Sequence, residues 1–300
     1  MPPRPVTLAI VVFWLASTGW LFVRDLWPVL RPGQRPPFTI DLTREAEGRK
    51  SGTHWVMYRN GERVGIANAT TQYDRRDGNY TLVTQINFEK FKHAVTLPLL
   101  GQRVEFDFRR LKSTYHVTAE GELIGMKADL DMAFRIDNLE EALLTVQVVG
   151  EVADGFLTPH WSIQTPQGLE PDFLLDQLAR GWDSEPIDVR GHGNMLNPMH
   201  PWNRLLNVRE GQTWHMTLFD PLQTSLGGFL GKGGVRRLEA GVLEGTQELY
   251  WDGKNVPCLV IKYKGDKLEA QTWVRQSDGL VLRQEAERPG ERLALERETR

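Results

Sequence analysis

The chain contains a single cysteine, Cys258, among 300 residues. An intramolecular disulfide therefore cannot form, and a zinc site built from several cysteines is excluded. Positive charge is not in excess either, because the formal net charge is −3. Nucleic-acid binding is not expected of such a chain, since phosphates need a surplus of basic groups to neutralise them. Cys258 lies in the alternating pattern NVPCLVIKY and is predicted to be a small buried residue rather than a reactive thiol.

Recognisable catalytic motifs are also absent. There is no G-x-S-x-G nucleophile elbow, and no two histidines have the helical spacing of zincins. The glycine-rich segment SLGGFLGKGGVRR is not a P-loop, because Gly227 and Gly231 are one residue too close and no Ser or Thr follows Lys232. We therefore expect no catalytic activity, no cofactor and no metal ion; an enzyme with a dispersed site is the remote alternative.

Long apolar runs are confined to the N-terminus. Val6–Val23 holds 18 residues without a charge, between Arg4 and Arg24. As a helix it would span about 27 Å, close to the hydrocarbon thickness of a bilayer. This predicts one transmembrane helix within a membrane anchor over 1–27. A cleaved signal peptide and a buried core helix are the alternatives, but the apolar run extends past the small residues at 16–18, beyond a cleavage site there.

The segment 28–50 follows the predicted anchor. It contains four prolines within ten residues, which cannot continue a helix and favour an extended stalk. Three arginines near the anchor (Arg24, Arg31 and Arg35) would place the C-terminal side in the cytoplasm by the positive-inside rule. Large domains translocate largely regardless of such charges. We therefore expect a single-pass membrane protein whose body is extracytoplasmic.

The body is predicted to be mainly β. In KADLDMAFRI, hydrophobic residues at even positions from Ala128 to Ile136 would share one face, and Asp129, Asp131 and Arg135 the other. This pattern is typical of an antiparallel sheet with one covered face and one wet face. The two aspartates are interpreted as part of the wet face, with an acid–base pair as the alternative.

Turn signals divide the body into strands. Asn60-Gly61 and Asp77-Gly78 predict hairpins, and Gly121, Gly253, Gly265, Gly279 and Gly290 mark further turns. We expect a main antiparallel β domain over 51–220, a glycine-rich loop over 221–236, and C-terminal strands over 237–300 that pack on or complete the main sheet. One short amphipathic helix is predicted near 171–180, lying across the concave face or an open end of the sheet. The predicted fold is a curved antiparallel sheet or half-barrel.

Three stretches carry a family resemblance: HWVMYRNGERVGIANAT (54–70), VREGQTWHMTLFDP (208–221) and TWVRQSDGLVLRQE (272–285). They resemble sections of uncharacterised bacterial cell-envelope β proteins and are similar in style to the LolA/LolB-like carriers. That resemblance implies a curved sheet bent around helices and an apolar cavity for acyl chains, with no catalytic residues. A carrier that shuttles would have no permanent membrane anchor, so the predicted anchor differs from what this resemblance implies.

Two segments hold candidate site residues. RGHGNMLNPMHPWNRL (190–205) offers His192 and His200 as metal ligands, but the turn-rich sequence favours a connection between two parts of the fold, pinned by Trp202. In the glycine-rich segment 225–237, Lys232, Arg236 and Arg237 are candidates for contact with lipid phosphates or an acidic partner.

The sequence thus predicts a non-catalytic, membrane-anchored envelope protein. The first hypothesis is that its curved sheet binds an apolar or lipid-like ligand, or a protein partner. The alternative is a structural or assembly accessory of an envelope complex, with no small-molecule ligand.

Overall fold

The structure is a computed structural model of the 300-residue chain. It describes residues 13–14, 17–18, 40, 42–47, 52–96, 103–119, 121–136, 142–164, 186–189, 200–218, 236–265, 268–288 and 290–299. Most of the predicted anchor, the predicted helix near 171–180 and the glycine-rich loop up to residue 235 lie outside these ranges. Within them, no helix has the length and hydropathy needed to cross a bilayer.

The described body is a single antiparallel sheet. Its strands run in the order β8-β7-β6-β5-β4-β3-β2-β1-β15-β14-β13-β12-β10-β9, with β11 paired to β12 beside this path. The strands are β1 (Thr53–Arg59), β2 (Glu62–Asp74), β3 (Asn79–Thr96), β4 (Arg103–Val117), β5 (Leu123–Ile136), β6 (Ala142–Ala153), β7 (Phe156–Gln164), β8 (Ile187–Asp188), β9 (Thr213–Leu218), β10 (Arg236–Val242), β11 (Gln247–Trp251), β12 (Lys254–Lys264), β13 (Glu269–Arg275), β14 (Val281–Arg288) and β15 (Glu291–Arg297). The prediction of a mainly β, open antiparallel sheet is confirmed.

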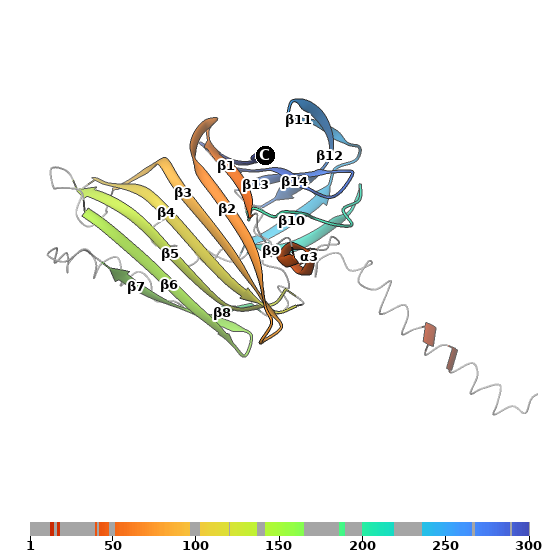
Figure 1. The fold of residues 1–300 in the computed structure, drawn as a ribbon, viewed down its shortest axis with the longest axis horizontal. Helices are drawn as coiled ribbons and strands as arrows, with labels where there is room; N and C mark the ends of the chain where they lie inside the picture. Colours follow the sequence, from red (N-terminus) through yellow and green to blue (C-terminus); the bar gives the residue numbers. More distant parts are fainter. Residues whose placement is uncertain are drawn as a thin grey trace, which may run out of the picture.

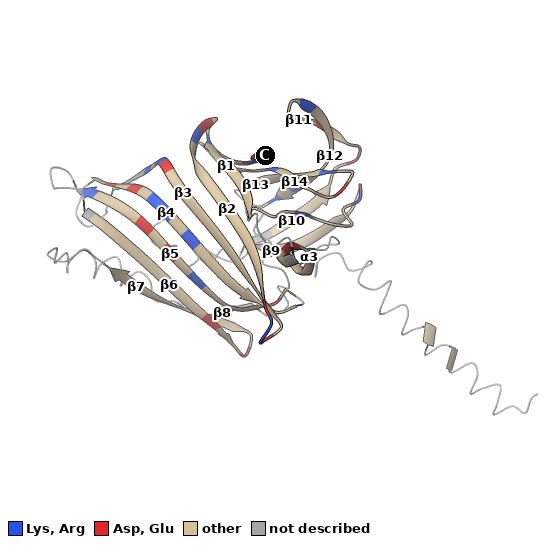
Figure 2. Ribbon diagram, viewed as in Figure 1, with Lys and Arg blue, Asp and Glu red and all other residues tan. Residues whose placement is uncertain are grey.

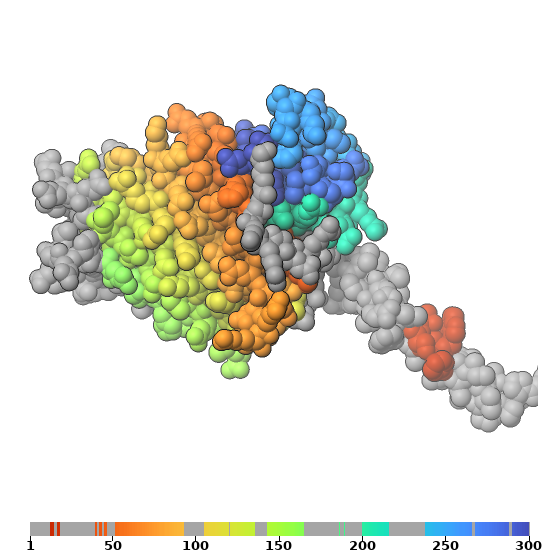
Figure 3. Space-filling model, in the orientation of Figure 1, coloured from red at the N-terminus to blue at the C-terminus, as the bar shows by residue number. Residues whose placement is uncertain are grey.

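Two meanders make up most of this sheet, and β9, β10 and β11 complete it beside β12. From β1 to β8 each strand pairs with the next one in sequence, and β12 to β15 do the same on the other side. The meanders meet where β1 pairs with β15, from Trp55 opposite Arg297 to Arg59 opposite Leu293. Figure 1 shows the long strands β2 to β7 as one broad group beside the smaller group of β9 to β15. In the space-filling view the two groups form adjoining parts of one surface (Figure 3).

The predicted turns are confirmed. Asn60 and Gly61 join β1 to β2, and both have positive φ, of 52° and 86°. A two-residue hairpin of this kind matches the right-handed twist of its strands and explains the Asn-Gly sequence. Turns also separate strands at Gly78, Gly121, Gly253, Gly265, Gly279 and Gly290.

The sheet is curved around one apolar face, here called the inner face. Trp55 of β1 and Trp214 of β9 belong to the same buried cluster, although their strands are six places apart in the strand order. Two such strands share a core only if the sheet curls toward it. On β5 the alternation predicted from the sequence is confirmed, because Leu130 and Met132 are buried whereas Asp129 and Asp131 keep part of their surface exposed.

Residues 42–47 correct the predicted stalk. They form the short helix α3 (Leu42–Glu47), which contacts β2, and Leu42 is buried in the cluster that contains Trp55. The prolines of the preceding segment favour an extended chain, and the prediction applied this conformation to the whole range 28–50. A second boundary also shifts, since β10 begins at Arg236, a residue that the sequence placed in the glycine-rich loop.

Candidate ligand-binding face

The inner face of β3 to β7 is strongly apolar and rich in phenylalanine. A buried cluster on these strands is surrounded by partly buried hydrophobic side chains, and together they are called the inner aromatic face. Its members are Phe88, Phe91, Phe106, Phe108, Leu111, Leu130, Met132, Phe134, Leu144, Val146, Trp161 and Ile163. The side chains at its margin, such as Phe88 and Trp161, remain partly exposed. Part of this apolar surface is therefore accessible at the edges of the face.

Irregular register concentrates the aromatic rings. In a regular strand Phe88 and Phe91 would point to opposite faces, because side chains alternate with a period of two. The register of β3 against β4 shifts between Asn87 and Phe91, and both rings then contact Phe108. The ring centroids lie 5.1 Å apart for Phe88–Phe91 and 5.5 Å apart for Phe91–Phe108. A bulge therefore places three phenylalanines in one aromatic cluster.

Charge is confined to the outer face of β4 and β5. Arg110 contacts Asp131 at 2.7 Å, and the Thr145 hydroxyl donates a hydrogen bond to the same carboxylate at 2.9 Å. The Gln147 amide donates to Asp129 at 2.7 Å. Figure 2 shows these charges along the strands. Both aspartates thus belong to a polar outer ladder, in agreement with the wet face predicted from the sequence.

Segment 200–205 is a packed connection, as predicted. The side chains of Trp202 and Leu205 are 6% and 1% exposed and lie in the main core. The backbone N–H of Leu205 donates to the Gly279 carbonyl at 2.9 Å, and the N–H of Val281 donates to the Asn203 carbonyl at 3.0 Å. The segment is therefore paired to the β13–β14 turn.

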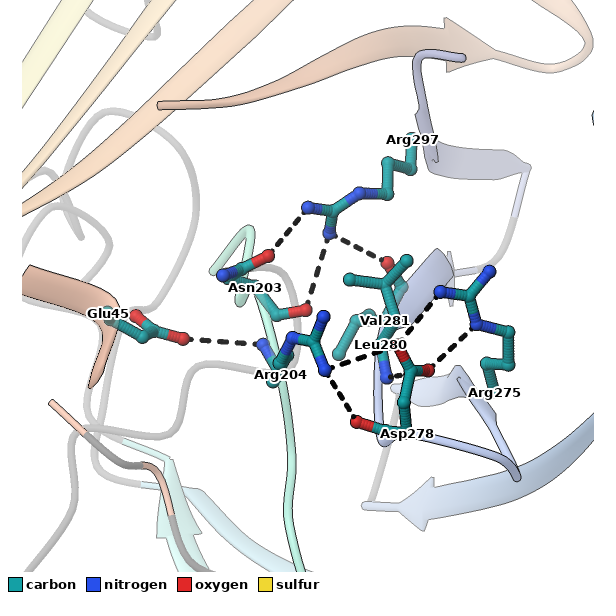
Figure 4. A network of polar contacts seen from close by, with 8 residues as sticks. All are labelled: Glu45, Asn203, Arg204, Arg275, Asp278, Leu280, Val281 and Arg297. Carbon is teal, nitrogen blue, oxygen red and sulfur yellow. Dashed lines mark hydrogen bonds and ion pairs between the residues drawn. The ribbon is translucent and has the colours of Figure 1, made fainter. Parts of the chain in front are cut away.

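A polar network surrounds this pairing (Figure 4). Arg297 donates to the carbonyl and to the side-chain oxygen of Asn203, at 3.3 and 2.6 Å. Asp278 accepts two hydrogen bonds from Arg275 at 2.8 and 2.9 Å and contacts Arg204 at 3.1 Å. The hydrogen bonds from Arg275 hold the pKa of Asp278 below its usual value. The network ties the crossing segment to both β13–β14 and β15.

Helix α3 joins the same network through Glu45. Its carboxylate accepts hydrogen bonds from the backbone N–H of Arg204 at 3.3 Å and from the Thr71 hydroxyl at 3.2 Å. Burial raises the pKa of Glu45, although these two hydrogen bonds and the charge of Arg297 act in the opposite direction. A proton at Glu45 therefore favours the docked helix.

Substituting Glu45 by Gln tests this coupling. A carboxyl whose pKa is raised by folding contributes its stability below the unfolded-state pKa and loses it as the pH rises through the folded-state pKa. We therefore expect the stability of the wild type, measured relative to Glu45→Gln by thermal unfolding, to be greatest near pH 4 and to decrease toward pH 7. Glu62→Gln, at an exposed position of β2, is the matched control. Parallel pH profiles of wild type and Glu45→Gln would contradict the coupling.

The predicted site residues are not brought together within the described chain. The rings of His200 and Trp202 pack with centroids 4.1 Å apart, and desolvation lowers the pKa of His200 to about 4. His200 is thus a neutral packing residue at pH 7. His192 and Lys232 lie outside the described residues. Arg236 and Arg237 begin β10, where they pair with Leu218 and Thr217.

Two further observations bear on chemistry. Cys258 is fully buried, which confirms the prediction of a buried residue, and burial raises its pKa to about 11. No group of three or more His, Cys, Asp or Glu side chains placed for metal binding occurs in the part of the chain that the structure describes.

The sequence did not reveal the buried hydroxyl groups of the inner face, Thr84 and Ser113, because single polar residues in an alternating strand carry no distinct signal.

Comparison with known proteins gives a likeness in structure but none in sequence. No family of known proteins matches the sequence, and no curated protein matches it. A crystal structure of a beta-barrel-like protein of the domain of unknown function DUF1849, from Brucella abortus, is 12% identical with a TM-score of 0.37. The match covers 83% of this chain and 97% of that chain. This neighbour is a bacterial β protein with no catalytic family assigned to it, and it gives no support to the LolA/LolB-like resemblance.

Proposed function

We propose that the chain is a binding protein for an apolar, acyl-chain ligand, which lies along the inner aromatic face. The observation that carries this proposal is the aromatic content of that face: five phenylalanines gather in its hydrophobic cluster, and the charged side chains of β4 and β5 lie on the opposite side. Burial of apolar ligand surface against it is favourable by about 25 cal/mol per Å².

The proposal includes a place in the cell. Val6–Val23 anchors the chain in a membrane, and the support is its uncharged run of 18 residues. The body lies outside the cytoplasm, and the support is that large domains translocate largely regardless of nearby basic residues. Anchoring puts the body close to a source of acyl chains. A reporter fused after Arg300 tests the topology, and reporter activity in the cytoplasm would overturn it.

Photo-crosslinking tests the binding function directly. The full chain, held in an amphipol, is illuminated with a hydrocarbon probe that carries a diazirine at mid-chain, and the labelled peptides are mapped by mass spectrometry. We expect labels on inner residues of β3 to β7, such as Phe91 and Trp161, and competition by unlabelled octadecene. Labels restricted to residues 1–39 or to the outer ladder would refute the proposal.

A matched pair of variants sharpens this experiment. Ile163→Asp introduces a charge among the partly buried side chains of the inner aromatic face and is expected to reduce labelling at least tenfold, because a charge opposes apolar binding. Ser162→Asp, at the neighbouring exposed position of β7, is expected to leave labelling unchanged. Equal labelling of both variants would show that the probe binds elsewhere. A stoichiometric protein partner without any inner-face labelling would favour the assembly-accessory alternative.

A further inference from the structure

A row of small side chains crosses the inner face beside the aromatic residues. The register places Ala69 opposite Thr84, Thr84 opposite Ser113, and Ser113 opposite Ala128. Ala128 in turn faces Val148 on β6. Neighbouring strands therefore contribute a continuous line of short side chains, which is called the small-residue row.

Larger side chains flank the row on both sides. Two positions further along each strand lies the line Ile86, Leu111, Leu130 and Val146, in matching register. On the other side are Leu82, Tyr115 and Met126. Side chains two residues apart on a strand share a face, so the row is lower than its surroundings.

Thr84 gives the row a polar centre. Its side chain is 5% exposed, and its hydroxyl has no hydrogen-bond partner in the part of the chain that the structure describes. Burying a hydroxyl without a partner is unfavourable, and valine has the same shape without that penalty. Ser113, which is 6% exposed, lies directly opposite Thr84 on β4. Two hydroxyl-bearing side chains thus share the centre of an apolar face.

The surroundings limit what those hydroxyls can bind. None of the side chains in the small-residue row or in its two flanking lines carries a charge at pH 7. A carboxylate or phosphate placed there would be a buried charge without a counter-charge, which is strongly unfavourable. A neutral carbonyl oxygen, in contrast, needs only a hydroxyl donor.

We propose that Thr84 and Ser113 anchor the neutral ester or amide carbonyl of the acyl-chain ligand, with the Thr84 hydroxyl donating a hydrogen bond to the carbonyl oxygen. The ligand is then a neutral acyl ester or amide, rather than a free fatty acid or a pure hydrocarbon. This inference rests on the proposed function, because it specifies the chemistry of the molecule bound on the same face.

Displacement of a pyrene-labelled alkane from the full chain in amphipol tests whether Thr84 and Ser113 bind the ligand carbonyl. The competitors are 1-monooleoylglycerol, octadecene and oleate, which differ in the carbonyl and in charge. We expect 1-monooleoylglycerol to bind more tightly than the other two. Thr84→Val should weaken 1-monooleoylglycerol about five- to tenfold, the factor that one hydrogen bond contributes, and should leave octadecene unchanged. Thr114→Val, on the outer face of β4, is the matched control.

The unliganded protein provides a second measurement. If the Thr84 hydroxyl has no partner, Thr84→Val is expected to raise the melting temperature of the ligand-free chain by about 2 °C. A lower melting temperature would show that the hydroxyl has a structural partner and would overturn the proposal that Thr84 and Ser113 bind the ligand carbonyl. So would equal losses of affinity for 1-monooleoylglycerol and octadecene, or tighter binding of oleate. Failure of every competitor to displace the alkane, or of the alkane to bind, would instead refute the proposed function.

Discussion

Replacing Trp202 by alanine is expected to lower the free energy of unfolding by about 3–5 kcal/mol, the usual cost of removing a buried tryptophan. The indole is 6% exposed, lies in the main core, and packs against the ring of His200. The substitution leaves a cavity that the surrounding strands cannot fill, because β1, β9 and β12 are held by their own sheet pairing. Urea denaturation followed by far-ultraviolet circular dichroism measures the change.

Tyr250→Ala is the control for this experiment. Tyr250 is also a large aromatic residue of the same protein, but it is 74% exposed. Exposed positions without special contacts usually change stability by less than about 0.5 kcal/mol. If Trp202→Ala were as stable as Tyr250→Ala, the crossing segment would not be pinned by its tryptophan.

Gly279→Ala is expected to cost about 4 kcal/mol. Gly279 has a φ of +73°, and a β-carbon there would overlap the Leu205 backbone carbonyl oxygen. The positive φ alone costs an alanine about 1 kcal/mol, and the overlap adds about 3 kcal/mol, since backbone must move. That movement also weakens the hydrogen bond from the Leu205 N–H to the Gly279 carbonyl.

Gly253→Ala isolates the steric part of this effect. Gly253 has the same φ of +73° in the β11–β12 turn, but a β-carbon there would meet nothing within 4 Å. We expect this variant to lose only about 1 kcal/mol. The difference between the two variants, measured by urea denaturation under identical conditions, reports the close approach of the crossing segment to the β13–β14 turn. Equal losses would show that the two segments do not touch in solution.

Local features of the fold could be predicted from the sequence, because short-range physics determines them. Asn60-Gly61 specifies a two-residue hairpin through its backbone preferences, and the period of two in 127–136 identifies the buried side of β5. The pairing of β1 with β15 could not be predicted in this way. Its partners come from opposite ends of the body, and no local pattern encodes which edges meet.

The residues of the candidate ligand-binding face could be predicted from the sequence even less well than the strand pairing. Strict alternation places Phe88 and Phe91 on opposite faces, and only the bulge between Asn87 and Phe91 brings both to Phe108. Thr84 and Ser113 lie 29 positions apart in sequence, so only the β3–β4 register makes them neighbours. His192 and His200 were candidate metal ligands because histidine is a common ligand, but the ring of His200 packs against Trp202.

The meeting of β1 with β15 also constrains how the protein is made. A ribosome delivers the N-terminal meander first, and its strands can pair in the order in which they emerge. The free edge of β1 must then wait for β15, which follows all the other strands of the sheet along the chain. An unpaired strand edge readily pairs with other chains. Nascent molecules therefore carry an aggregation-prone strand edge until β15 has been synthesised and has paired with β1.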